Sequence, residues 1–424
     1  MLIEFSVSNF KSIRETQTLT MAASKYFKEM ENENCIDTGI TGLPKLLRSA
    51  VIYGSNASGK SNLLSAIDFM NFMVRSSVKD IEEGEVLSVV PFRLDRDSKS
   101  KDSEFEIIFV EEKTRYQYGF AVNKTRVTRE WLIAYPERRP QRWFDREYNQ
   151  RKELDDYTFG PRFQGGRLRQ EWKNATRSNA LFLSVAVQFN SEQLKPVFNW
   201  FQKRLRVLNP PVPFFPGITS SVCETKEDKE KVINFLKVAD LSINDISITK
   251  EKISSAGLIA ADSKLPENFK KIMKVMDGVE IDRILFLHKN NETGELIPFD
   301  ISNESNGTKN LFGFAGYWVK MMSNNQVLFV DEIDTSLHPL IVQSLVNLFH
   351  RSGSNAQLIF TTHDTSLLSQ NIMRRDQIWF IEKGESGVSR LYSLVDFKVR
   401  EREALERGYL RGRYGAIPFI KEPV

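Results

Sequence analysis

The chain carries the stretch Gly54-Ser55-Asn56-Ala57-Ser58-Gly59-Lys60-Ser61, which fits the pattern G-x-x-x-x-G-K-[ST] at every fixed position. The apolar run Ala50-Val51-Ile52-Tyr53 before it predicts a short buried strand. Apolar residues recur at helical spacing after it and predict a helix over 62–73. A strand, a glycine loop and a helix in this order form a phosphate-binding loop, so the sequence predicts a nucleotide-binding α/β protein.

Each residue type in this loop has a chemical reason to be there. Glycines let the backbone turn its N–H groups toward a phosphate chain, and the dipole of the following helix adds positive potential. Lys60 is predicted to hold the β and γ phosphates. The Ser61 hydroxyl is predicted to ligate Mg²⁺, which keeps most of its waters and needs few protein oxygens. The predicted nucleotide contacts of the loop are Gly54, Asn56, Ser58, Gly59, Lys60 and Ser61.

A second apolar strand, Val327-Leu328-Phe329-Val330, ends in the carboxylates Asp331 and Glu332. A Mg²⁺-nucleotide site needs such acids opposite its phosphate loop. Asp331 is the predicted anchor of the metal's water shell, and Glu332 is predicted to orient and polarise the attacking water. Taken alone, the two acids also fit a solvated strand end, but the phosphate loop upstream favours the catalytic interpretation.

His363 directly follows the end of a third buried strand, whose sequence is Leu358-Ile359-Phe360-Thr361. Ligands of open α/β sheets bind at the carboxyl edge of the strands. His363 is therefore a candidate sensor of the γ phosphate, and with Lys60 and Glu332 it completes the predicted catalytic set. A histidine at such a place is by itself more often structural, and the two preceding motifs change that interpretation.

Length and composition bound the class of protein. The chain has 424 residues and a formal net charge of +4, from 59 Lys or Arg and 55 Asp or Glu. This length predicts two domains or one domain with a large insertion, and the balanced charge does not indicate a dedicated nucleic-acid-binding domain. Cys35 and Cys223 are far apart, which argues against a disulfide framework or a zinc site. Without a signal-like or long apolar segment, we expect a soluble, cytoplasmic protein without membrane contact.

Three regions follow one another along the chain. Residues 1–135 read as two strands, the phosphate loop with its helix, and an antiparallel meander. Residues 136–280 begin with a basic polar stretch and read as a mainly helical insertion for a partner or DNA. Residues 281–424 return to alternating strands and helices, which predicts a mainly parallel sheet. The helical patterns of the insertion lie at 194–205, 232–236 and 269–276, with a proline-rich break at 209–213.

The order of motifs resembles the ABC-type ATPases of the SMC and RecF-like branch. Within that branch it resembles stand-alone bacterial ATPases found beside defence effectors, such as the ATPase subunits of PARIS-like or RloA-like anti-phage systems. The resemblance implies an ABC-type P-loop ATPase head with an antiparallel β-subdomain. It covers both ends of the chain, through Ser8 to Ile13, the phosphate loop, Glu304 to Lys309, Asp331 to Asp334, Ser336 to Pro339, Thr361 to Asp364 and Gly412 to Pro418.

In that group a serine-glycine signature of one subunit closes over the γ phosphate bound by another. The resemblance therefore implies that Ser305, Gly307 and Thr308 contact nucleotide in trans, within homo-oligomers built on head-to-head dimers. Taken alone, this segment is a turn before a helix, and it lacks the usual leading leucine and second glycine. The group's nucleotide-sensing glutamine is also missing, and Arg93 is a candidate substitute. His338 falls where the group has a dimer-contacting loop, and it equally fits an ordinary helix start.

Two functions compete for this ATPase. By resemblance it binds ATP and Mg²⁺, hydrolyses ATP, and holds or releases a separately encoded effector, a Toprim-type nuclease, in response to a phage trigger protein. The alternative is a RecF/SMC-like DNA clamp in repair or recombination, because residues 137–177 contain eleven Lys or Arg against seven acids, with interleaved aromatics. That stretch also fits a solvated or protein-binding surface. A GTPase or kinase is a weaker third choice, because 123–126 lack the aspartate of an N-K-x-D element.

Overall fold

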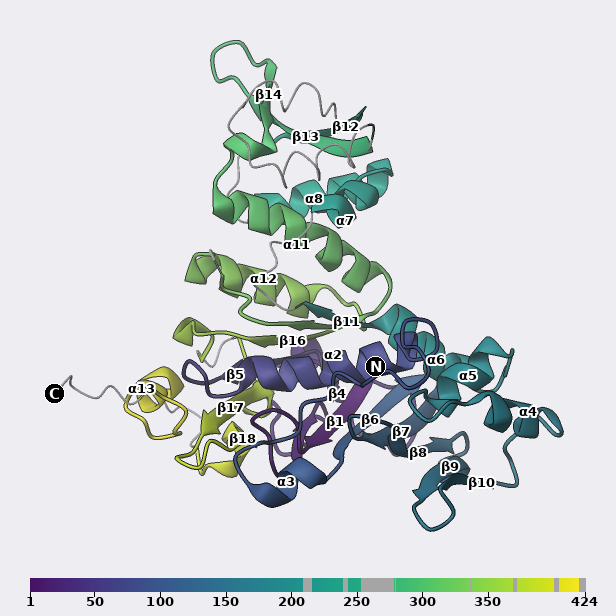
Figure 1. Cartoon of the computed structure of the whole chain (residues 1–424). Helices are drawn as coiled ribbons and strands as arrows, with labels where there is room; N and C mark the ends of the chain where they lie inside the picture. Colours follow the sequence, from purple (N-terminus) through teal and green to yellow (C-terminus); the bar gives the residue numbers. More distant parts are fainter. Residues whose placement is uncertain are drawn as a thin grey trace, which may run out of the picture. The chain divides into compact units, whose positions relative to one another are not determined.

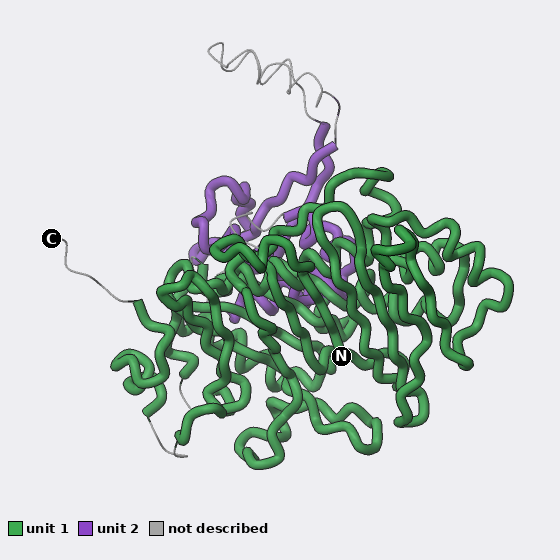
Figure 2. The backbone as a smooth tube through the Cα atoms, turned by 60° about the horizontal axis from the view of Figure 1, so that its bottom comes forward, with its two compact units in different colours: residues 1–210, 321–424 green, residues 211–320 purple. Residues whose placement is uncertain are grey.

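The computed structural model describes residues 1–208, 216–238, 243–252, 278, 280–335, 337–368, 372–399 and 404–418. The chain divides into two compact units, which Figure 2 colours green and purple. Unit 1 comprises Met1–Pro210 and Met321–Val424, and unit 2 comprises Pro211–Lys320. None of the described helices is both long enough and apolar enough to cross a membrane.

Unit 1 contains a seven-stranded antiparallel sheet in the order β10-β9-β8-β7-β6-β1-β2. The predicted N-terminal strand pair is confirmed, since Val7 pairs with Gln17 and Glu4 with Thr20. The predicted meander over 103–135 is also confirmed as β6 to β8, and β9 and β10 extend it. The strands are β1 (Leu2–Ser8), β2 (Gln17–Thr20), β6 (Ser103–Glu111), β7 (Thr114–Val122), β8 (Val127–Tyr135), β9 (Gln141–Asn149) and β10 (Leu154–Phe159).

The second sheet of unit 1 has six strands in the order β11-β15-β16-β5-β17-β18. Its first five strands are parallel and β18 is antiparallel, which confirms the predicted α/β class. These strands are β5 (Ser49–Tyr53), β11 (Leu205–Leu208), β15 (Val327–Val330), β16 (Gln357–Thr361), β17 (Ile378–Lys383) and β18 (Ser389–Ser393). β5, β15 and β16 each have only buried residues, as a strand covered on both faces requires.

Helix α2 (Lys60–Ser76) fills the core between the two sheets and confirms the helix predicted after the phosphate loop. Leu64 and Ile67 of this helix belong to one buried cluster with alternate residues of the six-stranded sheet, such as Ile52. Toward the other sheet, the ring of Phe69 lies 5.1 Å from that of Phe105. In Figure 1, α12 (Pro339–Arg351) lies on the face of the six-stranded sheet opposite α2. The sheet is therefore covered on both sides.

Short elements complete unit 1. The C-terminal segment packs on β17, because the ring of Tyr414 stacks on Phe380 and its carbonyl accepts the hydroxyl of Tyr392 (2.8 Å). The remaining strands and helices are β3 (Cys35–Ile36), β4 (Leu46–Leu47), α1 (Glu31–Asn34), α3 (Arg96–Ser100), α4 (Leu168–Ala175), α5 (Phe182–Gln188), α6 (Lys195–Asn199), the π-turn η1 (Trp200–Arg204), the 3₁₀ turns η3 (Thr365–Leu368), η4 (Arg375–Gln377) and η5 (Leu394–Asp396), and α13 (Leu405–Leu410).

Unit 2 is a three-stranded antiparallel sheet with helices, in the order β12-β13-β14. The ring of Phe286 on β13 lies 5.2 Å from that of Phe312, and Thr219 donates its hydroxyl to the Phe312 carbonyl (2.7 Å). The elements are α7 (Pro216–Val222), α8 (Lys226–Val238), β12 (Asp245–Lys252), β13 (Glu280–Lys289), β14 (Leu296–Asp300), the 3₁₀ turn η2 (Ile301–Asn303) and α11 (Asn306–Ser323), which ends beyond the unit.

The units divide the chain differently from the expected insertion at 136–280. Residues 136–208 belong to unit 1, because β9 and β10 continue the antiparallel sheet and β11 pairs with β15. Unit 2 combines helices with a three-stranded sheet that the sequence did not predict. Of the expected helical patterns, 232–236 lies in α8, and 194–205 forms α6 and η1 and ends as β11 begins. The pattern at 269–276 and the break at 209–213 lie outside the described residues.

Candidate functional site

The phosphate loop leaves β5 and enters α2 with Gly59 in a left-handed conformation (φ 118°), and the helix begins at Lys60. A Cβ atom on Gly59 would lie 2.8 Å from the Cβ of Ser389. A Cβ atom on Gly54 would meet the Ile381 carbonyl oxygen at a similarly forbidden distance. Both glycines are therefore required by the close approach of β17 and β18, in addition to the turn that the sequence predicts.

Two serines from distant parts of the chain hold the loop. The Ser389 hydroxyl lies 2.6 Å from the Ser58 carbonyl oxygen and 2.8 Å from the Ser12 hydroxyl. Asn62 of α2 donates its side-chain N–H to Ser12 (2.7 Å). Ser12 lies in the β1–β2 turn, where Asn9 anchors the motif by donating to the backbone oxygens of Ser98 and Lys101. Sequence reasoning gave Ser12 and Ser389 no role, although Ser12 lies within a quoted motif.

Lys60 is buried and folds over its own loop. Its ammonium donates to the carbonyl oxygens of Gly54 (2.7 Å) and Ser55 (3.2 Å). Burial lowers the pKa of Lys60, and the negative charges of Asp331, Glu332 and Asp334 oppose that shift. The ammonium of Lys60 therefore lies within the electrostatic influence of three carboxylates. Its hydrogen-bond partners in this structure are two backbone carbonyl oxygens of the loop.

The other predicted loop contacts differ in exposure. Asn56 and Ser61 are exposed, whereas Ser58 is buried and its hydroxyl has no hydrogen-bond partner among the residues that the structure describes. An unpaired buried hydroxyl is costly in a folded protein, so this atom suits a bound acceptor such as a phosphate oxygen. The exposed Ser61 hydroxyl at the start of α2 is free to reach an ion in front of the helix.

The acids at the end of β15 are fixed from β16. Asp331 is buried and accepts a hydrogen bond from the Thr361 hydroxyl at 2.6 Å. Glu332 has a left-handed backbone (φ 48°), and its N–H donates to the same hydroxyl at 2.7 Å. Its side chain is exposed. The structure thus holds Asp331 inward as a metal-site anchor would be held, and leaves Glu332 open to solvent and substrate.

His363 is exposed just past β16, and its backbone N–H donates to the Asp334 carboxylate at 3.2 Å. The other oxygen of Asp334 is buried and has no partner in the described ranges of the chain. The Tyr53 hydroxyl at the end of β5 donates to the Asp364 carbonyl at 2.9 Å, which ties the His363 loop to the strand that precedes the phosphate loop. Sequence reasoning quoted Asp334 as part of a motif without assigning it a function.

These three motifs meet because β15, β16 and β5 are parallel neighbours. Their carboxyl ends lie at one edge of the sheet, so Asp331, His363 and the phosphate loop are brought together from positions far apart in the chain. Lys60, Glu332 and His363, the predicted catalytic set, all lie at this edge. Nothing in the sequence alone gives the strand order that makes them neighbours.

The predicted signature lies in unit 2 and caps α11. The Ser305 hydroxyl accepts the N–H of Thr308 at 3.1 Å and lies 2.9 Å from the Thr308 hydroxyl. Ser305 is exposed, Thr308 is buried, and Gly307 lies in the first turn. The turn-before-helix interpretation therefore holds for the local structure. An exposed serine at the N-terminus of an 18-residue helix also retains the dipole that favours an anion.

Two weaker sequence suggestions, His338 and Arg93, have different outcomes. The His338 side chain accepts the N–H of Leu340 at 3.2 Å and caps α12, which matches the ordinary helix start. Its neighbour Ser336 lies outside the described residues. Arg93 is exposed beside the buried Phe92, whose N–H donates to Asn9 at 3.1 Å, so its role as a substitute for the missing glutamine stays a prediction.

A pocket of about 490 Å³ lies between the β1–β2 turn and α2 and contains none of the predicted site residues. Lys11 of the β1–β2 turn lines it together with Ser65, Asp68 and Arg75 of α2. Burial lowers the pKa of Lys11, and the Asp68 carboxylate opposes the shift.

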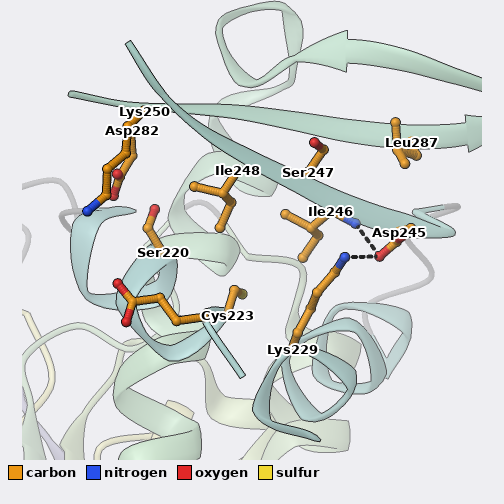
Figure 3. A pocket seen from close by; sticks show the side chains of 11 residues that line it. Ser220, Cys223, Lys229, Asp245, Ile246, Ser247, Ile248, Lys250, Asp282 and Leu287 are labelled. Atoms are coloured by element: carbon orange, nitrogen blue, oxygen red, sulfur yellow. Dashed lines mark hydrogen bonds and ion pairs between the residues drawn. The ribbon is translucent and has the colours of Figure 1, made fainter. Parts of the chain in front are cut away.

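A pocket of about 470 Å³ in unit 2 contains none of the predicted site residues (Figure 3). Lys229 pairs with Asp245 at its rim (2.7 Å). Burial raises the pKa of the Cys223 thiol in its wall to about 11, so this cysteine is a poor nucleophile. Cys35 and Cys223 are both free and buried.

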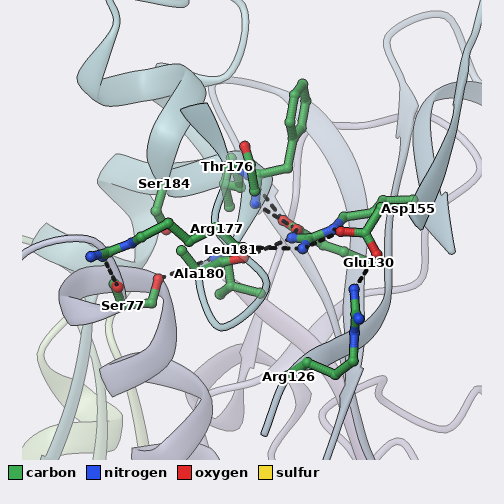
Figure 4. A network of polar contacts seen from close by, with 12 residues as sticks. Ser77, Arg126, Glu130, Asp155, Thr176, Arg177, Ala180, Leu181 and Ser184 are labelled. Atoms are coloured by element: carbon green, nitrogen blue, oxygen red, sulfur yellow. Dashed lines mark hydrogen bonds and ion pairs between the residues drawn. The ribbon is translucent and has the colours of Figure 1, made fainter. Parts of the chain in front are cut away.

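The basic stretch over 137–177 is partly internal. Arg146 is fully buried, and its guanidinium donates to the Asp155 carboxylate (2.8 Å) and the Ala180 carbonyl (2.7 Å). Asp155 and Ala180 are labelled in the polar network of Figure 4. Arg142 pairs with Asp145 at 3.2 Å. Arg146 therefore holds the seven-stranded sheet to the segment after it and is not free for phosphates, whereas Arg142 pairs within its own strand and stays exposed.

A protein-family model matches residues 49–369 and carries the description "AAA domain, putative AbiEii toxin, Type IV TA system". The chain belongs to this AAA domain family. The match spans the phosphate loop, both acids and His363, and it confirms the predicted ATPase class at the level of the family. Family membership implies ATP binding, usually with Mg²⁺.

Two solved structures resemble the AAA domain chain at low identity. The SMC head domain from Thermotoga maritima is 14% identical to this chain, with a TM-score of 0.40. The match covers 92% of this chain and 98% of the SMC head domain chain. An SMC head bound to the C-winged helix domain of ScpA is 15% identical, covers 92% and 97%, and has a TM-score of 0.43. No curated protein matches the chain.

The residues of this AAA domain fit a Mg²⁺-nucleotide. Within the described part of the chain, the Ser58 hydroxyl and one Asp334 oxygen are buried without partners, and Lys60 donates to two loop carbonyls. The loop cradle has no room for an additional Cβ at Gly54 or Gly59. Ser61 and Asp331 are the two oxygen donors available for the ion, whose other ligands would be waters and phosphate oxygens.

Proposed function

We propose that this AAA domain protein is an ATPase that binds ATP with Mg²⁺ at the carboxyl edge of the six-stranded sheet and hydrolyses it to ADP and phosphate. The observation that carries the proposal is the arrangement at one sheet edge of the phosphate loop, Asp331 with Glu332, and His363. Each motif alone has a structural explanation. A sheet edge that gathers all three supports nucleotide chemistry.

Each residue has a task in this proposal. Lys60 exchanges its two loop carbonyls for oxygens of the β and γ phosphates. Ser61 and Asp331 hold Mg²⁺, which neutralises charge on the phosphates. Glu332 accepts a proton from the attacking water or orients that water. His363 contacts the γ phosphate and reports its loss.

Two substitutions test the ATPase. Lys60→Ala removes the cation that holds the phosphates, so we expect nucleotide binding to fall below detection by titration calorimetry. Glu332→Gln keeps the shape of the side chain but cannot act as a base, so we expect normal ATP affinity and hydrolysis slowed at least about tenfold. Glu385→Gln is the control, because it makes the same change at an exposed acid outside the predicted site, and it should hydrolyse ATP at the wild-type rate. Full turnover by Glu332→Gln would refute its catalytic role.

We further propose that the ATPase state governs a separately encoded effector in anti-phage defence. The description of the matched family, which names a toxin and a toxin–antitoxin system, supports a role beside an effector. The described residues include no second acidic cluster of the kind a fused nuclease would use. The effector proposed is a Toprim-type nuclease, released when a phage trigger protein is sensed.

Affinity purification tests the effector proposal. Tagged Glu332→Gln protein, with and without ATP, should retain the product of a neighbouring gene, and wild-type protein should release it during phage infection. The efficiency of phage plating should be lower on cells that express this protein and the neighbouring gene than on cells that express neither. Cells in which this protein carries Lys60→Ala should regain the higher plating efficiency. Retention of no partner together with unchanged plating would contradict the defence role while leaving the ATPase proposal intact.

The DNA clamp is the second candidate, and the structure lends it less support. Arg146 is buried and paired within the protein, and Arg142 pairs with Asp145 although it is exposed. The other exposed cations of the same stretch are Arg138, Arg139, Arg151, Lys152, Arg162 and Arg167. Salt-sensitive binding of duplex DNA that is lost when Arg138 and Arg139 are replaced by Ala would favour the clamp over the effector proposal.

A further inference from the structure

A single hydroxyl lies between the two acids of the candidate ATPase site. The Thr361 side chain donates to the Asp331 carboxylate at 2.6 Å and accepts the N–H of Glu332 at 2.7 Å. Thr361 is fully buried at the end of β16. One side chain from a neighbouring strand therefore fixes the residue assigned to the metal and the backbone of the residue assigned to the water.

The backbone around Thr361 strengthens this link. The Thr361 carbonyl accepts the N–H of Ile333 at 3.1 Å, and the N–H of His363 donates to Asp334 at 3.2 Å. Residues 331 to 334 are thus connected to residues 361 to 363 by four hydrogen bonds, one at each of Asp331, Glu332, Ile333 and Asp334. The two strand ends form one unit, in which a displacement at His363 reaches the acids directly.

The conformation of Glu332 shows why such a link is needed. Its φ of 48° is a left-handed value that residues with a Cβ rarely adopt. A residue holds such a conformation only where its surroundings fix it, and these positions concentrate at functional sites. The hydrogen bond from the Glu332 N–H to Thr361 is one of the contacts that fix it here, and it sets the direction in which the exposed carboxylate leaves the chain.

We propose that Thr361 is a positioning residue for ATP hydrolysis, whose hydroxyl orients Asp331 toward the metal and Glu332 toward the attacking water. The proposal rests on the ATPase function proposed above. Thr361 does not touch the nucleotide in this assignment and acts through the two acids. Its loss lowers the catalytic rate and weakens the use of Mg²⁺, while contacts made by the phosphate loop alone remain.

The adjacent threonine supplies a matched control. Thr362 is also fully buried, and its hydroxyl accepts the N–H of Asp364 at 2.9 Å. Replacing either threonine by valine keeps the shape and removes one buried hydroxyl. A purely structural role therefore predicts similar effects for Thr361→Val and Thr362→Val, whereas a positioning role predicts different ones.

The experiment compares Thr361→Val, Thr361→Ser and Thr362→Val with the full-length wild-type protein. Steady-state hydrolysis gives kcat and the KM for ATP at several Mg²⁺ concentrations, and thermal melts give Tm. We expect Thr361→Val to lose at least about tenfold in kcat and to need several-fold more Mg²⁺ for half its maximal rate. Its affinity for ATP measured without Mg²⁺ should stay within about twofold of wild type. Thr361→Ser, which keeps the hydroxyl, and Thr362→Val should each stay within about threefold of wild type in kcat.

Equal losses of kcat in Thr361→Val and Thr362→Val would overturn the proposal, as would an unchanged Mg²⁺ requirement in Thr361→Val. If Thr361→Val does not fold, Thr361→Ala provides the same comparison without the buried methyl groups. If wild-type protein binds ATP but does not hydrolyse it, the ATPase proposal fails by itself. The Mg²⁺ dependence of nucleotide affinity then still decides whether Thr361 orients Asp331.

Discussion

At the scale of single residues, the glycines of the phosphate loop do more than turn the chain. Gly59 combines a φ of 118° with a neighbouring side chain that leaves no room for a Cβ. Sequence reasoning supplied the first reason, because the pattern requires a glycine there. The second depends on Ser389, which approaches the loop from β18 and is 330 positions away in the chain. The two reasons predict different consequences of substitution.

Gly59→Ala should therefore lower both stability and nucleotide affinity. The left-handed conformation and the contact with Ser389 together should cost about 1–3 kcal/mol of unfolding free energy. A displaced loop should weaken ATP binding at least about tenfold. Chemical denaturation and titration calorimetry measure the two effects. Gly84→Ala is the control, because Gly84 has a φ of 78° but no atom within 4 Å of its Cβ position. Normal ATP affinity in Gly59→Ala would contradict the steric account.

At the scale of elements, strands with a clear apolar pattern were predicted from the sequence, whereas β9, β10 and β11 were not. β5, β15 and β16 are mostly apolar runs, so their composition alone predicts that they are buried. β10 alternates exposed and half-buried residues at a sheet edge, and β9 carries the buried Arg146, so both read as a polar stretch. β11 follows a π-turn within an apolar pattern at helical spacing, which concealed the strand.

The contact between α12 and β5 gives the protein a pH-dependent stability. Burial, with a smaller effect of Arg48, lowers the pKa of His350 from its usual 6.5 to about 3, and the imidazole lies 2.8 Å from the Ser49 hydroxyl. The unfolded chain binds a proton at His350 below about pH 6.5, whereas the folded chain does so only near pH 3. Stability from this site is therefore complete above pH 6.5 and is lost as the pH falls.

We expect His350 to account for a loss of about 2 kcal/mol of unfolding free energy between pH 7 and pH 5. His350→Gln should be less stable at neutral pH but should show a flatter pH dependence by that amount in urea denaturation. His338→Asn is the matched control, because it replaces an exposed histidine with another capping residue and should keep the wild-type slope. An unchanged slope in His350→Gln would refute the assignment.

At the scale of the whole molecule, the functional residues are divided between two units. Lys60, Glu332 and His363 belong to unit 1, whereas the predicted signature Ser305, Gly307 and Thr308 belongs to unit 2. In the group that the chain resembles, this signature serves the nucleotide of a second copy. We therefore propose that two chains associate when ATP is bound.

Mass measurement tests this association. Glu332→Gln protein should shift from monomer to dimer mass on addition of ATP and Mg²⁺, because it retains the nucleotide. Adding Ser305→Arg should abolish the shift while ATP affinity stays within about threefold, since a bulky cation would then occupy the interface. Asn303→Arg places the same charge two residues away and should still permit the dimer. A dimer that forms in spite of Ser305→Arg would exclude the signature from the interface.

The sequence by itself determined the motifs and the class of fold, because a phosphate loop, an acidic strand end and a helical period are encoded by residues close together in the chain. Tertiary structure alone decided which motifs meet. The order β15-β16-β5 places Asp331, His363 and Lys60 at one edge and gives Thr361 its contact with Asp331. Ser12 and Ser389 meet because the β1–β2 turn and β18 both lie against the phosphate loop. These contacts join residues that are far apart in the chain, and such hydrogen bonds produce no periodic pattern in the sequence that would predict them. The local sequence patterns therefore predicted the type of chemistry, and the packing of the sheets decided which residues lie beside the predicted site.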